Sequence, residues 1–144
     1  MNPATEGPEE APRGTLTVRT IAMPGDTNAN GDIFGGWVMS RMDQAGGIAG
    51  VDRAQGRVVT IAVDAMTFFR PVKVGDVLAV YAEIESVGRT SMKIHIEAWA
   101  KRFRTTLHEK VTEATFTGRM NCTPSIATVT TRPRARSTPA MPPA

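Results

Sequence analysis

The chain has 144 residues, the size of one ordinary domain, and 41% of them are hydrophobic, enough for a modest core. The formal net charge is +3, but three arginines lie in residues 132–144, which contain no acid. The rest of the chain is formally neutral, so its basic character does not predict a nucleic-acid-binding protein. The single cysteine, Cys122, excludes an intrachain disulfide and a cysteine metal cluster and fits a reducing cytoplasm. Because the sequence lacks an apolar run of about 20 residues and its N-terminal stretch has no apolar core, we predict neither a membrane span nor a signal peptide.

Proline residues mark the expected boundaries of the domain. Eight of the ten prolines lie in residues 1–14 and 123–144. Both ends are therefore predicted to be disordered, with a Pro/Arg-rich tail at 123–144. Residues 15–122 are predicted to form a single domain without internal repeats.

The N-terminal half predicts a strand, a loop and one long helix. Residues 15–23 alternate with β-branched side chains and indicate a strand that ends at Pro24. Residues 25–36 are rich in Asn, Asp and Gly and indicate a loop. Residues 36–52 indicate a helix despite several glycines, which are poor helix formers. These glycines make sense if the helix is buried and other backbone comes close.

The C-terminal half predicts four strands, at about residues 58–69, 77–87, 91–103 and 110–117. The short turn at Gly88-Arg89 predicts a hairpin between the second and third of these. In the third strand the apolar side chains Ile94, Ile96, Ala98 and Ala100 share one face, and Lys93, His95, Glu97 and Lys101 share the other. One long helix against a mainly antiparallel sheet is an α+β arrangement.

The start of the predicted helix offers hydrogen-bond donors suited to a catalytic site. A helix N-terminus offers free backbone N–H groups and the positive end of the helix dipole. Gly35 and Gly36 at that position let a carbonyl group approach without a side chain in the way. An N–H group there is suited to a carbonyl oxygen that develops negative charge, and Asn28 supplies a carboxamide in the preceding loop.

Asp43 is an unexpected residue in the middle of this helix. Gly36 and Asp43 share one helical stripe, but seven residues separate them by roughly 10 Å along the axis. If both act on one carbonyl group, they come from different chains. Two antiparallel helices related by a two-fold axis place Gly36 of one chain near Asp43 of the other, twice.

Residues 26–36 followed by Met42-Asp43 resemble the signature of the hotdog-fold acyl-CoA thioester hydrolases, and most closely the short bacterial YciA type. The resemblance covers about residues 15–117 and includes further segments at 56–60, 66–68, 70–72, 74–77, 87–91, 96–99 and 111–114. The segment after Gly118 departs from the family pattern. The resemblance implies a long central helix wrapped by a curved antiparallel sheet, and homodimers that often assemble into hexamers as trimers of dimers.

The resemblance also implies the site residues. The catalytic pair of the family matches Asn28 and Asp43, acting across the dimer interface, and its oxyanion contact resembles the N–H group of Gly36. The remaining positions expected to bind substrate or CoA are Gly35 at the helix start, Phe68, Phe69 and Arg70 before Pro71, and Gly88, Arg89, Thr90 and Ser91 in the later turn.

We therefore predict a cytoplasmic thioesterase that hydrolyses acyl-CoA to a carboxylic acid and CoA, without a cofactor or a metal of its own. Asp43 acts either as general base on a water or as a direct nucleophile, and the sequence leaves both open. The alternative functions are a non-catalytic acyl-CoA-binding or sensing domain and a structural assembly protein. His95 lies on the polar face of its strand and His108 follows a loop-like segment, so both are predicted to be solvated. No third ligand has metal-site spacing.

Overall fold

The computed structural model describes residues 11–120, which form one long helix and five strands. In chain order the elements are β1 (Thr15–Ile21), the short 3₁₀ helix η2 (Pro24–Asp26), α1 (Gly35–Ala54), β2 (Val58–Phe68), β3 (Val77–Val87), β4 (Ser91–Lys101) and β5 (His108–Met120). All the expected elements are therefore present, with ends that differ by a few residues from those predicted.

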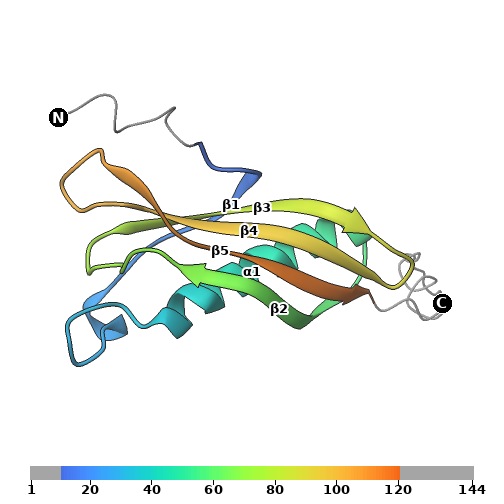
Figure 1. Cartoon of the computed structure of the whole chain (residues 1–144), viewed down its shortest axis with the longest axis horizontal. Helices are drawn as coiled ribbons and strands as arrows, with labels where there is room; N and C mark the ends of the chain where they lie inside the picture. The colour runs from blue at the N-terminus through green and yellow to red at the C-terminus, as the bar shows by residue number, and fades with distance from the viewer. Residues whose placement is uncertain (1–10, 121–144) are drawn as a thin grey trace, which may run out of the picture.

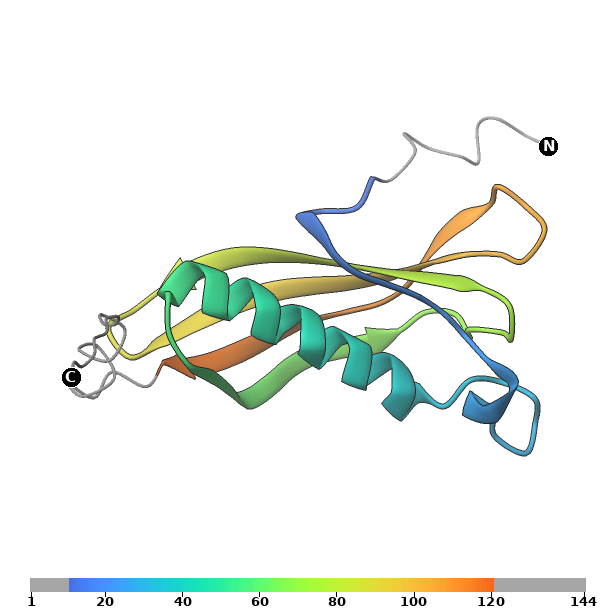
Figure 2. The same ribbon diagram turned by 180° about the vertical axis from the view of Figure 1, so that it is seen from behind.

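The strands form one antiparallel sheet in the order β1-β3-β4-β5-β2. Strands β3, β4 and β5 follow one another as a meander in the centre, and β1 and β2 occupy the two edges. The sheet curves around α1, which lies across one face (Figure 1; Figure 2). This arrangement confirms the predicted α+β hotdog fold.

The hydrophobic core fills the space between α1 and the sheet. The helix buries Val38, Met42, Ala45, Gly46 and Gly50, at spacings of three and four residues that put them on one side. Opposite them, alternate residues of β4 are buried, as the sequence predicts: Ile94, Ile96, Ala98 and Ala100. The same core continues into β5 through Val111, Ala114 and Phe116.

Two glycines let α1 lie close to the sheet. A Cβ atom on Gly46 would lie 2.9 Å from Cδ1 of Ile96, and one on Gly50 would lie 3.1 Å from Cγ1 of Val58. Both distances are shorter than ordinary carbon–carbon contacts. Gly46 and Gly50 thus lower helix propensity in exchange for close helix–sheet packing. The close neighbours are side chains and not the backbone that was expected, and a Cβ atom on Gly47 would meet nothing within 4 Å.

The outer face of the sheet, away from α1, contradicts one prediction. His95 was expected to be solvated, yet its exposed fraction is only 8%, and Glu97 on the same face is 3% exposed. Alternation along one strand predicts which side chains share a face, but not what covers that face. His108 is exposed, as predicted, and its ring stacks on Trp99 with a centroid distance of 5.1 Å.

The expected disordered ends fall largely outside the described residues, as do Cys122 and the Pro/Arg-rich tail. Within the N-terminal stretch, Arg13 forms ion pairs with Glu83 and Glu85 on β3, so the described fold begins before Thr15. No helix within residues 11–120 combines the length and the apolar content that a membrane crossing requires.

Candidate active site

The loop before α1 is a compact turn built around Asn28. The side-chain oxygen of Asn28 accepts hydrogen bonds from the backbone N–H groups of Asn30 (2.9 Å) and Asp32 (3.1 Å). Gly31 completes the turn with a φ of +84°, a conformation that favours glycine. Because the carboxamide oxygen is used by the loop, the NH₂ group is the part of Asn28 that remains to bind a ligand.

The loop is anchored at its far end. Ile33 is buried, and its N–H group donates to the carbonyl oxygen of Val72. Asp32 also forms an ion pair with Lys73. These contacts fix the point at which the chain enters α1.

The start of α1 leaves the N–H groups of Gly35 and Gly36 open, whereas the N–H group of Trp37 donates to the carbonyl oxygen of Phe34. Phe34 is the N-cap residue and makes no side-chain cap, and the first turn has no acidic residue. The N–H group of Gly36 has no hydrogen-bond partner within residues 11–120, and the residue is exposed. The positive end of the helix dipole is therefore available to a carbonyl oxygen or an anion.

Asp43 lies two turns further along α1 and is exposed at the side of the helix next to the edge strand β2. Its Oδ1 accepts a 2.6 Å hydrogen bond from Oγ1 of Thr60 on β2. The hydroxyl group orients the carboxylate and leaves Oδ2 without a partner among the described residues. Thr60 was not predicted as a site residue, since a contact between residues 17 apart follows only from the packing of β2 against α1.

Gly36 and Asp43 line one open groove of about 350 Å³. Its other lining residues are Met39 and Ser40 of α1, Val63 of β2 and Phe116 of β5. Gly36 and Asp43 thus lie on one stripe of the helix, as predicted, and this stripe borders the edge of the sheet. Val63 and Phe116 were not predicted as site residues, because only the sheet topology brings them to the helix.

Phe68 at the end of β2 and the two residues after it divide between the two faces of the sheet. Phe68 lies beside Gly35 at the start of α1 and is about half exposed. The ring of Phe69 lies instead 5.9 Å from Nζ of Lys110, which is also 5.9 Å from the ring of Trp99 on the outer face. Arg70 donates to the carbonyl oxygen of Lys110. Of these three residues, only Phe68 lies on the same side of the sheet as the groove within one chain.

The predicted CoA-contacting turn lies at the opposite end of the molecule. The turn at 88–91 is closed by the N–H group of Gly88, which donates to the carbonyl oxygen of Ser91, and Thr90 accepts from the N–H group of Met120. Met120 pairs with Val58, which packs against Gly50 near the end of α1. One chain therefore places this turn far from Gly36, with most of the roughly 30 Å length of α1 between them (Figure 1).

The comparisons with known proteins agree with this fold. The thioesterase superfamily matches residues 30–106. The acyl-CoA thioester hydrolase YciA of Escherichia coli K12 is 58% identical over 91 residues, which cover 63% of this chain and 69% of that protein. A protein of Haemophilus influenzae described as an uncharacterized acyl-CoA thioester hydrolase is 52% identical over 108 residues, covering 73% and 70% of the two chains.

Solved structures extend the likeness to three dimensions. The hexameric thioesterase y2039 of Yersinia pestis superposes with a TM-score of 0.75 at 50% identity, covering 80% of this chain and 93% of that one. HI0827, a hexameric broad-specificity acyl-coenzyme A thioesterase, gives a TM-score of 0.74 at 46% identity, covering 81% and 80%. The chain belongs to the thioesterase superfamily and, within it, to the hotdog-fold acyl-CoA thioester hydrolases of the YciA type.

Proposed function

We propose that this protein is a thioesterase that hydrolyses acyl-CoA to a carboxylic acid and free CoA. One observation carries the assignment: an uncapped helix start and an oriented aspartate line the same groove in a chain of this family. A thioester carbonyl is electrophilic and a thiolate leaves readily. One good hydrogen-bond donor and one carboxylate base are therefore enough for the reaction.

In the proposed mechanism the thioester oxygen accepts a hydrogen bond from the N–H group of Gly36, which stabilises the negative charge of the tetrahedral intermediate. Asp43 takes a proton from a water that the NH₂ group of Asn28 helps to position, and the water oxygen bonds to the carbonyl carbon. Collapse of the intermediate breaks the C–S bond, and the CoA thiolate leaves and takes up the proton held by Asp43. The hydroxyl group of Thr60 holds the Asp43 carboxylate in place. Direct attack by Asp43 remains the alternative chemistry. No cofactor takes part in either scheme, since CoA belongs to the substrate.

The proposed site is shared between two chains. The axial distance of roughly 10 Å between residues 36 and 43 is too long for one carbonyl group to reach both. Strand β2 is an edge strand with exposed apolar side chains at Val59, Ile61 and Val63. Such an edge is suited to pairing with a second copy of this chain. Two-fold pairing along β2 sets the helices antiparallel, with Asp43 of each chain facing Gly36 of the other.

The same pairing accounts for the distant turn at residues 88–91. This turn lies near the C-terminal end of its own helix, so an antiparallel partner carries it toward the N-terminal end of the neighbouring α1. The nucleotide of CoA is proposed to bind there, near Arg89, with Phe68 beside the pantetheine arm. We extend the assembly to a trimer of dimers, in keeping with the hexameric solved relatives. A cytoplasmic location stays a prediction.

The experiment that separates an enzyme from an acyl-CoA sensor is thiol release from a panel of acyl-CoAs. Asp43→Asn keeps the size of the side chain and its hydrogen bond to Thr60, and we expect it to lower kcat by about 100-fold or more while the fold persists. Asp52→Asn on the same helix is the matched control and should retain full turnover, because Asp52 lies outside the groove of Gly36 and Asp43. Binding of CoA without any thiol release by the wild type would favour the sensor.

Mixed oligomers test whether the site is shared. Asn28→Ala and Asp43→Asn are each expected to be inactive alone. When the two variants are unfolded and refolded together, half of the dimers are mixed, and each mixed dimer contains one intact site if Asn28 and Asp43 come from different chains. Recovery of about a quarter of the wild-type activity is therefore expected. No recovery would place both residues of each site in a single chain.

A further inference from the structure

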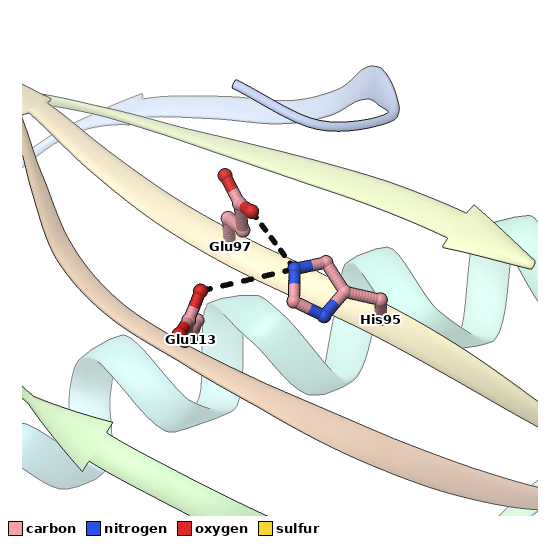
Figure 3. A group of neighbouring side chains, drawn as sticks. All are labelled: His95, Glu97 and Glu113. Atoms are coloured by element: carbon pink, nitrogen blue, oxygen red, sulfur yellow. Dashed lines mark hydrogen bonds and ion pairs between the residues drawn. The ribbon is translucent and has the colours of Figure 1, made fainter. Parts of the chain in front are cut away.

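A second cluster of ionisable side chains lies on the outer face of the sheet, on the side opposite α1. His95 and Glu97 project from β4 and Glu113 from β5, and the three converge in front of the sheet with α1 behind it (Figure 3). Nε2 of His95 lies 2.8 Å from Oε2 of Glu97 and 3.9 Å from Oε1 of Glu113. The cluster is separate from the proposed active site and does not depend on it.

The strand register places two carboxylates of this cluster where a cation is needed between them. Glu97 and Glu113 are paired directly opposite each other on β4 and β5. Like charges in that position repel each other, and Glu97 is buried, so the repulsion is only weakly screened by water. A positive charge between the two carboxylates is therefore needed to stabilise the pair.

Glu97 is held in a fixed orientation by groups behind it. Its Oε1 accepts hydrogen bonds from Nε1 of Trp99 (2.9 Å) and from the backbone N–H group of Arg13 (3.2 Å). Burial alone would raise the pKa of Glu97, but the hydrogen bonds from His95, Trp99 and Arg13 and the charge of Lys110 outweigh burial and lower the pKa below its ordinary value. The carboxylate is thus charged and its Oε2 is directed toward His95.

We propose that His95, Glu97 and Glu113 form a binding site for a divalent transition-metal ion, with Zn²⁺ as the ion to test first. One imidazole nitrogen and two carboxylate oxygens, all within 4.8 Å of one another, are a ligand set that zinc accepts, and small side-chain movements bring each to bonding distance. The hydrogen bonds from Trp99 and Arg13 play the part that orienting partners play in metal sites. The side chain of Glu113 is one-third exposed and gives the ion a path of entry.

Lys110 is the competing cation. Its Nζ lies 3.0 Å from Oε1 of Glu113 and 3.9 Å from Oε2 of Glu97, so the ammonium group already faces both carboxylates. A bound ion displaces it, and the flexible lysine chain can turn to solvent over the rings of Phe69 and Trp99. Removal of the ammonium group should therefore tighten metal binding rather than weaken it.

The test is calorimetric titration of zinc into the chelator-treated full-length protein. We expect one ion per chain at micromolar zinc, and a rise in the melting temperature because the ion binds only the folded state. Glu113→Gln should weaken binding by at least about tenfold, and His95→Gln by as much or more. Lys110→Met should strengthen it. Glu113→Gln is the decisive variant, because its partly exposed side chain can be replaced without loss of the fold.

Matched controls separate this cluster from other zinc ligands. His108→Gln removes the other histidine and Cys122→Ser the only thiol, and both should bind zinc as the wild type does. Circular dichroism and cooperative melting check that each variant is folded. The proposal is overturned if the wild type binds no zinc, if Glu113→Gln and His95→Gln bind it undiminished, or if only Lys110→Met binds it. The last result would mean that the ammonium group already satisfies the cluster.

Discussion

Ile96 and Glu97 are neighbours on β4, and both are almost completely buried, yet they face opposite sides of the sheet. Ile96 packs beneath α1, close to Gly46. Glu97 lies on the outer face among His95, Trp99 and Lys110. The same degree of burial is thus stabilised by apolar packing on one side and by compensated charges on the other.

The difference teaches that the two faces respond to different conditions. Packing beneath the helix depends on shape and volume and is insensitive to pH and salt. The outer face depends on the ionisation of its carboxylates and on the groups that compensate them. Substitutions at adjacent positions of one strand can therefore separate the two contributions.

The largest effect is expected from Ile96→Ala. The truncation leaves a cavity beneath α1 next to Gly46, and we expect a loss of about 2–5 kcal/mol in the free energy of unfolding. Denaturant unfolding measures it, and the loss should be the same at neutral and mildly acidic pH. Ile48→Ala, on the exposed side of α1, is the control and should change stability by less than about 0.5 kcal/mol. Equal effects at the two positions would contradict the assignment of the core.

Glu97→Gln should have a smaller effect that depends on pH. At neutral pH we expect a loss of about 1–3 kcal/mol, since His95 and Lys110 lose their charged partner while the shape is kept. The pKa of Glu97 is lowered by folding, so the charged form stabilises the protein fully above the ordinary value of 4.5. That contribution disappears as the pH falls from this value through the lower pKa of the folded state.

The measurement is the stability difference between wild type and Glu97→Gln as a function of pH. The two curves should converge in acid. Curves that stay parallel throughout would mean that the glutamate acts through its shape alone. A double variant with Ile96→Ala should show additive losses only if the two faces are independent.

The smallest effect is expected from Arg13→Ala at the rim of the outer face. The guanidinium group pairs with Glu83 and Glu85, but these side chains remain substantially exposed. We expect a loss of about 0–1 kcal/mol that shrinks further in high salt. The backbone N–H group of residue 13 still reaches Glu97 in this variant. A loss as large as that of Glu97→Gln would show that the N-terminal stretch contributes more to the outer face than its ion pairs.

The sequence predicts the elements well because each carries a local pattern. The alternation of β4 and the punctuation by Pro24, Pro71 and Gly88 place the strands within a few residues of their observed ends. The helix runs from Gly35 to Ala54, slightly longer than predicted, and ends where Gln55 adopts a left-handed conformation. The left-handed residue is Gln55 and not the glycine that follows it, so the sequence does not mark the exact end of the helix.

The site is harder to predict because it depends on contacts between distant residues. Gly36 and Asp43 follow from helical spacing, but Thr60 and Val63 reach them only through the position of β2 at the sheet edge. The prediction that His95 is solvated is wrong for the same reason. Its partner Glu113 lies 18 positions away and meets it through the pairing of β4 with β5, which no spacing rule for metal ligands anticipates.

The sheet order has a consequence for how the chain folds. The central strands β3, β4 and β5 are joined by short turns, but the edge strand β2 must pair with the last strand, as Val58 does with Met120. During synthesis β2 leaves the ribosome well before β5 is made. Its apolar side chains therefore remain exposed to solvent until β5 can pair with it. Such non-local pairing slows folding and lengthens the time in which nascent chains can aggregate.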